Sequence, residues 1–268
     1  MTGATLLYLS HGGGPLPLLD DADHREMVST LKALAAQIRK PSAILVISAH
    51  WEEAQPTVTS GASPPLIYDY YGFPEKSYLI QYPCAGEPAL AQRVQAALSD
   101  AGLDAQQDAE RGVDHGLFVP LKIMYPDADI PCIQLSLLSS LDAEQHILLG
   151  EALQSLDEDN LLVIGSGFSF HNMRAFFAEE TAETQAMNEG FDAWLNDTCL
   201  GADLSEATRR QRLVEWDKAP HARYCHPREE HLLPLQVCYG LAQRPASSAF
   251  HCRILGKQAS MFLWEPAP

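Results

Sequence analysis

The stretch Ala43-Ile-Leu-Val-Ile-Ser48, followed at once by Ala49-His50-Trp51, sets the expected fold class. A short apolar run without alternating polar positions is typical of a strand that is buried on both faces of a sheet. The run stops at a histidine. In α/β proteins, functional groups gather at the carboxyl ends of such strands. The stretch therefore predicts a central strand with a candidate functional residue, His50, at its end.

Two further runs have the same form. Residues 4–10 (Ala-Thr-Leu-Leu-Tyr-Leu-Ser) stop at His11-Gly-Gly-Gly-Pro15, and Leu161-Leu-Val-Ile-Gly165 leads through a turn to His171. Other segments alternate with these runs. Strands are expected over 131–137, 249–255 and 259–264, and helices over 23–39, 87–101, 142–156 and 184–213. The alternation predicts a single α/β domain over residues 1–268, a sandwich with a central, largely parallel or mixed β-sheet and helices on both faces.

The composition narrows the function classes. Hydrophobic residues make up 46% of the 268 residues and charged residues 20%, as in ordinary globular proteins. The 18 basic and 35 acidic residues give a formal charge of −17, which repels phosphate backbones, so no nucleic-acid partner is expected. The N-terminus lacks a basic segment before its apolar run, and no run is long enough for a membrane helix. We expect a cytoplasmic protein without a membrane partner.

The six cysteines are scattered and form no Cys-x-x-Cys pair. This spacing indicates neither a disulfide framework nor a thiolate zinc site, so free and mostly buried thiols are expected.

A long segment between Pro56 and Pro88 is rich in proline, glycine and aromatic residues, among them Tyr68-Asp-Tyr-Tyr71-Gly-Phe73-Pro. Loops of this length are uncommon in compact domains unless they are functional. The aromatic side chains would suit a lid or wall over a flat apolar ligand. The alternative is that they only anchor the loop to the body of the protein.

A dense polar stretch, His226-Pro-Arg-Glu-Glu-His231-Leu-Leu-Pro-Leu, opens an apolar helical pattern near the C-terminus. Pro227 fits the first turn of a helix, and Glu229 and Glu230 would lie near the positive end of the helix dipole. We therefore expect a rigid helix start that directs His231 into a cleft.

The chain has ten histidines, and several fall where parallel strands should end. Neutral imidazole is a common metal ligand, and a catalytic metal needs about three protein ligands and open positions. His11, His50 and His231 would provide such a set, although a hydrogen-bonded structural histidine is the ordinary alternative for each. We assign structural roles on solvated faces or an edge strand to His24, His146 and His251.

His115 lies between Asp114 and Gly116. A neighbouring carboxylate could orient or charge the imidazole, which suits a general acid or base. The alternative is that the Asp114-His115 pair merely caps a helix.

Taken in order, the motifs of nearly the whole chain resemble those of the class III extradiol ring-cleaving dioxygenases (the LigB-like family), in their DOPA 4,5-dioxygenase-like branch. The motifs are Ser10-His-Gly-Gly, Ser48-Ala-His50-Trp51, Tyr71-Gly-Phe-Pro74, Asp114-His-Gly116 with Val119-Pro-Leu, Tyr125-Pro-Asp-Ala-Asp-Ile-Pro131, Gly165-Ser-Gly with His171-Asn-Met-Arg174, and His226-Pro-Arg-Glu-Glu-His-Leu-Leu-Pro234.

The resemblance implies a mononuclear non-haem Fe(II) bound by His11, His50 and His231, with His171 as a fourth ligand or an acid/base. It also implies that His115 handles substrate protons from outside the metal shell. The protocatechuate-cleaving branch uses a glutamate as third ligand, which leaves Glu230 as an alternative to His231. Some members of the DOPA-like branch are found with Zn(II), so the native metal stays open.

The implied activity is insertion of both atoms of O₂ into a catechol-type aromatic, with ring opening next to the diol. Trp51, Tyr71 and Phe73 could cover the catechol ring. Two alternatives remain: a Memo-like module that binds a metal or ligand without oxygen chemistry, and a zinc hydrolase. The substrate within the catechols and the oligomeric state, with a homodimer among the options, are not determined by the sequence.

Overall fold

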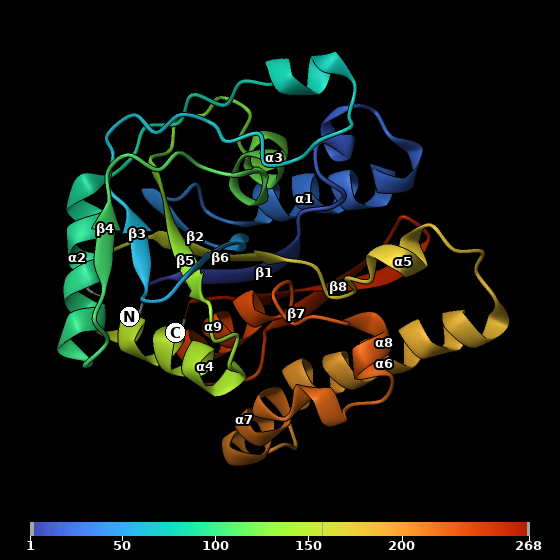
Figure 1. The fold of residues 1–268 in the computed structure, drawn as a ribbon. Helices are drawn as coiled ribbons and strands as arrows, with labels where there is room; N and C mark the ends of the chain where they lie inside the picture. Colours follow the sequence, from blue (N-terminus) through green and yellow to red (C-terminus); the bar gives the residue numbers. More distant parts are fainter. Residues whose placement is uncertain (1–2, 157, 267–268) are drawn as a thin grey trace.

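The computed structural model describes residues 3–156 and 158–266, and within them the strands form one eight-stranded sheet (Figure 1). The strand order is β4-β3-β5-β2-β6-β1-β8-β7. The strands are β1 (Thr5–Ser10), β2 (Ala43–Glu53), β3 (Thr57–Thr59), β4 (Gln106–Asp108), β5 (Cys132–Leu138), β6 (Leu161–Gly167), β7 (Ser248–Ile254) and β8 (Lys257–Trp264).

The four strands at the centre are parallel, because β2 pairs with β5 and β6, and β6 pairs with β1. Their side chains are buried along almost the whole of each strand, as expected for a sheet covered on both faces. The outer strands make the sheet mixed: β8 is antiparallel to β1, β7 to β8, and β3 to β5. The predicted α/β class and mixed sheet are confirmed.

Helices cover both faces of the sheet. In Figure 1, α1 and α3 lie above it, and α4, α6, α7, α8 and α9 lie below. The α-helices are α1 (Arg25–Gln37), α2 (Pro88–Asp100), α3 (His115–Met124), α4 (Ala143–Ala152), α5 (Met173–Phe176), α6 (Ala182–Leu200), α7 (Glu206–Val214), α8 (Ala222–Cys225) and α9 (Leu233–Ala242). Short 3-10 helices are η1 (Leu16–Leu18), η2 (Ala22–His24), η3 (Glu75–Leu79), η4 (Leu153–Ser155) and η5 (Trp216–Lys218).

Helix α9 and the loop before it approach the central strand β6 very closely. A Cβ atom added to Gly165 would lie 2.6 Å from the carbonyl oxygen of Pro234, and one added to Gly167 would lie 2.0 Å from that of His231. Real side chains do not tolerate such contacts, so only glycine permits this approach. The close approach brings His231 to the carboxyl end of β6.

Several predicted boundaries were wrong. The helix expected to begin at Pro227 begins at Leu233, and residues 227–232 form bends and turns instead. Pro234, not Pro227, occupies the first helical turn, where its missing N–H costs nothing. Strand β2 continues past His50 to Glu53, with a register shift between Ile47 and Glu52.

Two other expectations were too coarse. The helix predicted over 184–213 is two helices, α6 and α7, which separate after Gly201 caps the first. The long loop after β2 contains the short strand β3, which no periodic pattern had indicated because it spans only Thr57–Thr59. All six cysteines are buried free thiols, as predicted.

No helix among the described residues is long and apolar enough to cross a membrane.

Candidate metal and proton-transfer site

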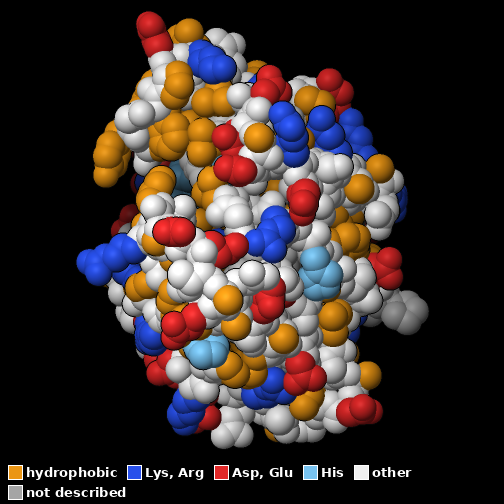
Figure 2. Space-filling view, turned by 90° about the vertical axis from the view of Figure 1, so that its right-hand side faces the viewer, with side chains coloured by type: hydrophobic (Ala, Val, Ile, Leu, Met, Phe, Trp, Pro, Cys, Tyr) orange, Lys and Arg blue, Asp and Glu red, His pale blue; other side chains and the backbone are white. Residues whose placement is uncertain are grey.

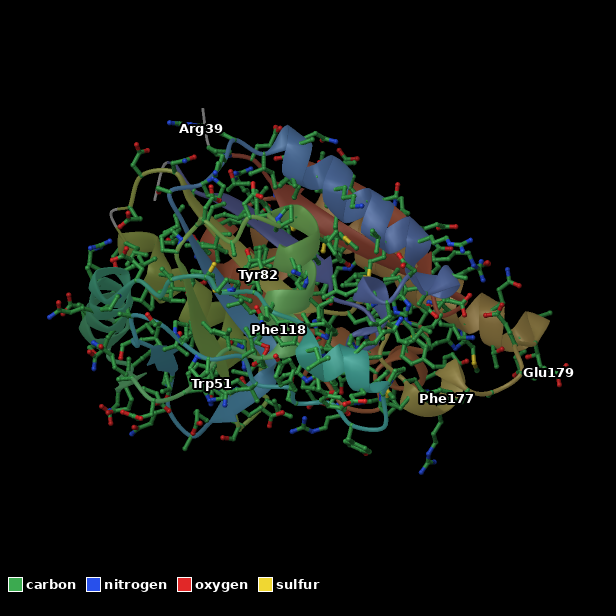
Figure 3. All side chains as sticks on the ribbon, turned by 90° about the horizontal axis from the view of Figure 1, so that it is seen from above. Arg39, Trp51, Tyr82, Phe118, Phe177 and Glu179 are labelled. Atoms are coloured by element: carbon green, nitrogen blue, oxygen red, sulfur yellow. The ribbon has the colours of Figure 1, made fainter. Side chains whose placement is uncertain are left out.

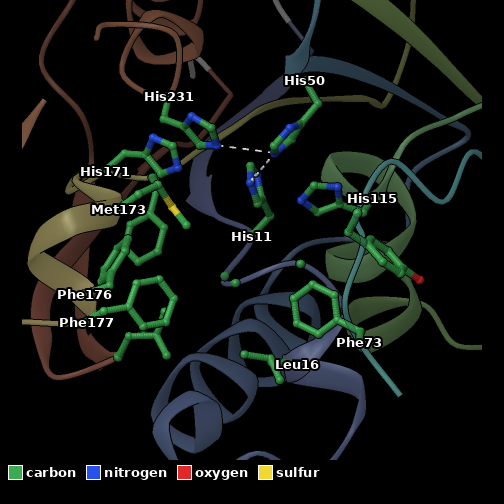
Figure 4. Close-up of a pocket in the computed structure, with 16 residues that line it drawn as sticks. His11, Leu16, His50, Phe73, His115, His171, Met173, Phe176, Phe177 and His231 are labelled. Carbon is green, nitrogen blue, oxygen red and sulfur yellow. Dashed lines mark hydrogen bonds between the residues drawn. The ribbon is translucent and has the colours of Figure 1, made fainter. Parts of the chain in front are cut away.

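Three histidines from separate parts of the chain meet at the carboxyl ends of β1 and β2 (Figure 4). His11 follows β1, His50 lies near the end of β2, and His231 lies in the turn before α9. The Nε2 atom of His50 is 3.0 Å from that of His11 and 3.3 Å from that of His231. The structure therefore brings together the three side chains that the sequence predicted as metal ligands.

Hydrogen bonds on the outer sides of two rings fix which nitrogen carries the proton. The Ser166 hydroxyl donates to the Gly116 carbonyl, so its oxygen accepts from His11 Nδ1 at 3.0 Å. His231 Nδ1 lies 3.0 Å from Glu230 Oε1, and a carboxylate can only accept. Both rings therefore carry their proton on Nδ1 and direct the lone pair of Nε2 toward the centre of the cluster.

The three imidazoles are held in their neutral form. Burial lowers the pKa of His11, His50 and His231, and the other histidines of the cluster lower it further. Converging lone pairs in a desolvated site repel one another unless a cation lies between them. One ligand nitrogen from each of the three rings lies within 4.8 Å of the other two, so this donor set fits a divalent metal.

The position of His231 is fixed through its own backbone. Its carbonyl oxygen accepts from the Tyr8 hydroxyl at 2.9 Å and from the Phe168 backbone N–H at 3.0 Å. Tyr8 belongs to β1 and Phe168 directly follows β6. The strands that carry the rest of the site therefore also position this histidine.

His115 lies on one side of the cluster, at the start of α3. Its ring centroid is 3.9 Å from that of His50. Its partner is Asp69, whose Oδ1 accepts from the His115 Nδ1 at 2.8 Å and from the His115 backbone N–H at 3.1 Å. Burial raises the pKa of Asp69, but the hydrogen bonds from His115 and the electrostatic attraction of His115 and His50 together outweigh it, so the pKa is lowered overall and the carboxylate is charged.

The sequence had suggested Asp114 as the carboxylate next to His115. Asp114 instead caps α3 by accepting from the Gly116 N–H, and it also accepts from Ser48 at 2.8 Å. Its carboxylate is thereby turned away from the His115 ring into the core, where burial raises its pKa. Asp69 could have been noticed as the acidic residue among the tyrosines of residues 68–71.

His171 lies on the opposite side of the cluster, before α5. Its ring stacks on that of His231 with centroids 3.4 Å apart, and its Nδ1 is 3.0 Å from Glu230 Oε1. The same oxygen atom of Glu230 therefore contacts both His171 and His231. Burial raises the pKa of Glu230, but the hydrogen bond and electrostatic attraction of His171, a backbone hydrogen bond and the Arg228 guanidinium together outweigh this effect, so the pKa is lowered.

A cavity of about 300 Å³ opens beside the five histidines (Figure 4). This volume is at the lower end of the range for small-molecule sites. Apart from the histidines and three glycines, its lining is apolar or aromatic: Leu16, Tyr70, Phe73, Phe168, Met173, Phe176, Phe177 and Leu255. Of these the sequence had singled out Phe73, and Tyr70 belongs to the same aromatic segment. The others carry no distinctive pattern, and only the fold brings them together.

Two predicted substrate contacts lie elsewhere. Side chains alternate along a strand, so Trp51 points away from His50. Its indole is 3% exposed, donates to Glu53 Oε1 at 2.8 Å and packs under the Arg111 guanidinium. Tyr71 is 91% exposed and does not line the cavity. Figure 3 shows Trp51 well separated from Phe177, which does line it.

Three other histidines lie outside the cavity lining. His24 and His146 were expected on solvated faces, but both are fully buried. His24 Nε2 accepts from the Gly13 N–H at 2.9 Å, and His146 Nε2 accepts from the Leu138 N–H at 3.1 Å. His251 is exposed on β7, as predicted.

The family model that describes the catalytic LigB subunit of aromatic ring-opening dioxygenase matches residues 5–262. The chain belongs to this family. Three relatives support the assignment. The chain is 38% identical to dioxygenase tasH of Hapsidospora irregularis, over 97% of this chain and 85% of that protein. It is 39% identical to the 4,5-DOPA dioxygenase extradiol of Beta vulgaris (88% and 85% covered) and 33% identical to that of Escherichia coli K12 (87% and 83%).

The fold is that of a solved LigB-like structure. An uncharacterized protein from Escherichia coli K12 matches with a TM-score of 0.75 and 28% identity, covering 97% of this chain and 99% of that one. The LigB family is metal-dependent, and its aromatic ring-opening dioxygenases use a small aromatic molecule and O₂. The histidine cluster is the candidate place for that metal.

Proposed function

We propose that this protein is a non-haem Fe(II)-dependent extradiol dioxygenase, which inserts both atoms of O₂ into a catechol-type aromatic and opens the ring next to the diol. Residues 1–268 would form a single catalytic domain. His11, His50 and His231 would hold the iron, and Zn(II) could take its place in the isolated protein. The observation that carries the proposal is the convergence of three neutral imidazoles beside an apolar cavity.

The donor set fits Fe(II) and leaves positions for substrate. Three protein ligands on a six-coordinate metal leave three positions, enough for the two oxygens of a diol and for O₂. Bound iron would supply the electron transfer that couples the diol to O₂. The neutral imidazoles leave the metal charge uncompensated, which favours a negatively charged diol in the cavity.

His171 and His115 are proposed as the groups that move protons. Each has its Nδ1 bonded to a carboxylate, Glu230 or Asp69, which keeps the proton on Nδ1 and leaves Nε2 as a base. Either Nε2 could accept a proton from a diol hydroxyl, and the carboxylate would then stabilise the cationic ring. The same imidazole could later return the proton. His171 could alternatively act as a fourth ligand.

The cavity walls are proposed to hold the ring and exclude water. Phe73 lies on one side of the cavity and Phe176 with Met173 on the other (Figure 4). Such walls suit the flat apolar face of a catechol, whose two hydroxyls would point toward the histidines.

Iron content and catechol-dependent O₂ uptake of anaerobically purified protein test this function. About one iron per chain and formation of a ring-opened product are expected after Fe(II) reconstitution. His11→Ala, His50→Ala and His231→Ala should each lose the iron. His251→Gln, which changes an exposed histidine on β7, should retain both iron and turnover.

Failure of the reconstituted protein to cleave any of a panel of catechols would contradict the proposal and favour a ligand-binding module. Ester or amide hydrolysis that persists without O₂ would instead indicate a zinc hydrolase.

A further inference from the structure

The cavity and its mouth carry information about the part of the substrate that lies outside the diol. Apolar side chains continue from the interior to the rim: Phe168 is 1% exposed, Met173 55% and Phe177 84%. Figure 2 shows hydrophobic side chains gathered around a hollow on this face. Large exposed apolar side chains at a pocket rim are unusual unless something covers them.

The charged groups that border this cavity are already paired. Asp69 and Glu230 lie behind His115 and His171, and both are committed to those imidazoles. Within the described residues, neither lysine nor arginine lines the cavity. The Arg228 guanidinium lies 3.5 Å from Glu230 Oε2 and is engaged by Glu52 through two hydrogen bonds of 2.6 and 2.7 Å. Arg174 follows Met173 but is exposed and does not line the cavity.

The hydroxyl group on the wall is also occupied. Tyr70 is the tyrosine of the cavity lining, and its hydroxyl donates to the Ser77 carbonyl at 2.7 Å. The neighbouring wall is formed by Leu16, Phe73 and Leu255, which offer no hydrogen bond to a ligand. A charged group placed there would lose its hydration without gaining a partner.

We propose that the natural substrate is a catechol whose ring substituent is uncharged and apolar, such as an alkyl or aryl group, and not a carboxylate or amino-acid side chain. The diol would face the histidines, and the substituent would extend between Phe73 and Phe177 toward the mouth. This inference rests on the proposed function, since it assumes that a diol occupies the cavity. This proposed substrate differs from DOPA, for which several relatives are named, because DOPA carries a charged amino-acid side chain.

Binding of a matched pair of catechols to anaerobically purified, Fe(II)-reconstituted protein tests the proposal by calorimetry. One ligand carries a 3-methylbutyl chain and the other a propionate chain of the same size and branching. We expect the neutral ligand to bind at least about 10-fold more tightly, because the acid must be desolvated in an apolar site. L-DOPA should also bind more weakly than the neutral ligand.

A second test places a positive charge at the rim of the cavity and measures the same preference between the two ligands. Phe177→Arg should reduce the preference for the neutral ligand by about 3-fold, as an exposed ion pair would. Leu148→Arg adds the same charge to an exposed position on α4, away from the cavity, and should leave the preference unchanged. An equal response to both substitutions would mean that overall charge, not the cavity, sets the preference, and would contradict the proposal.

The outcomes separate this inference from the proposed function. Equal or tighter binding of the acid overturns the inference, while O₂ uptake with unsubstituted catechol would still support the dioxygenase. Selective binding of the neutral ligand without O₂ uptake would support the inference about the cavity and contradict the enzyme. If no diol binds, both are wrong.

Discussion

Two imidazole–carboxylate pairs flank the three-histidine cluster, and they are built differently. In the His115–Asp69 pair, one carboxylate oxygen accepts from both the ring and the backbone of the same residue. In the His171–Glu230 pair, one oxygen serves His171 and the proposed ligand His231. The His171 side chain is also more exposed, at 19% against 6% for His115. In the first pair, the other carboxylate oxygen lies 3.7 Å from Nδ1 of the proposed ligand His50, whereas in the second pair a single oxygen bonds both the proposed acid/base and a proposed ligand. The second pair therefore couples proton transfer to metal binding more directly.

The largest effect is expected from His171→Gln. Glutamine cannot accept and return a proton, so turnover should fall at least ~10²-fold if His171 is the acid/base, while iron stays largely bound. Turnover and iron content of the same preparation measure the two effects. Loss of iron would identify His171 as a ligand instead, and unchanged turnover would end both assignments and leave His115 as the base.

Glu230→Gln should lower the metal affinity more than Asp69→Asn does. The amide no longer provides a charged acceptor for the His231 Nδ1–H, and loss of such an orienting partner lowers metal affinity by about 10- to 100-fold. Competition with a chelator measures the affinity. If Asp69→Asn weakened metal binding as much, the difference between the two pairs would not hold.

Asp69→Asn should have a smaller effect, mainly on catalysis, because Asp69 Oδ2 lies 3.7 Å from Nδ1 of the proposed ligand His50, beyond hydrogen-bond distance. The asparagine oxygen can still accept from the His115 backbone and ring, but the charge that stabilises a cationic imidazole is lost. We expect turnover to fall roughly 10-fold with full iron content. A fall as large as that for His171→Gln would show that His115, not His171, is the principal base.

The smallest effect concerns the acid stability of the loop that carries His171. His226 is fully buried, its Nε2 donates to the Ser169 carbonyl at 3.0 Å, and burial lowers its pKa to about 3. Because the unfolded chain binds this proton near pH 6.5, the free energy of unfolding should fall as the pH drops below that value. The loss amounts to about 1 kcal/mol between pH 6.5 and 5.5.

His226→Asn supplies the control, because its amide can still donate to Ser169 but does not titrate in this range. Denaturant unfolding at the two pH values should show a shallower pH dependence for the variant than for the natural chain. Identical dependence would exclude His226 as a source of acid sensitivity.

The sequence predicted best the positions of residues that directly follow, or lie near the end of, a buried strand. His11 and His50 could be predicted as neighbours, because the buried runs before them indicate parallel strands that end at one edge. His231 was proposed as the third ligand from its place in a dense polar stretch before an apolar helical pattern, and the resemblance to a known family implied the same role. Its delivery by a helix start was wrong, since propensity alone could not show that α9 begins only at Leu233.

What could not be predicted depends on contacts between distant segments. Asp69 replaced Asp114 as the partner of His115 because a residue 46 positions away folds back over α3. Phe168, Phe177 and Leu255 reach one cavity from three connections, and none has a distinctive spacing. Trp51 was misplaced because the strand continued past His50, and alternation then turned the indole away.

The way in which the Tyr8 hydroxyl and the Phe168 N–H hold the His231 carbonyl has an evolutionary consequence. The bond from the Phe168 N–H joins two main-chain groups, so it persists when side chains are exchanged, whereas the Tyr8 hydroxyl adds a side-chain bond from β1. The glycines of β6 leave room for both bonds. The walls of the cavity come from other segments: the loops around Leu16 and Phe73, α5 and the turn at Leu255. Substrate range can therefore drift among descendants of this chain while the geometry of the ligand set is inherited intact.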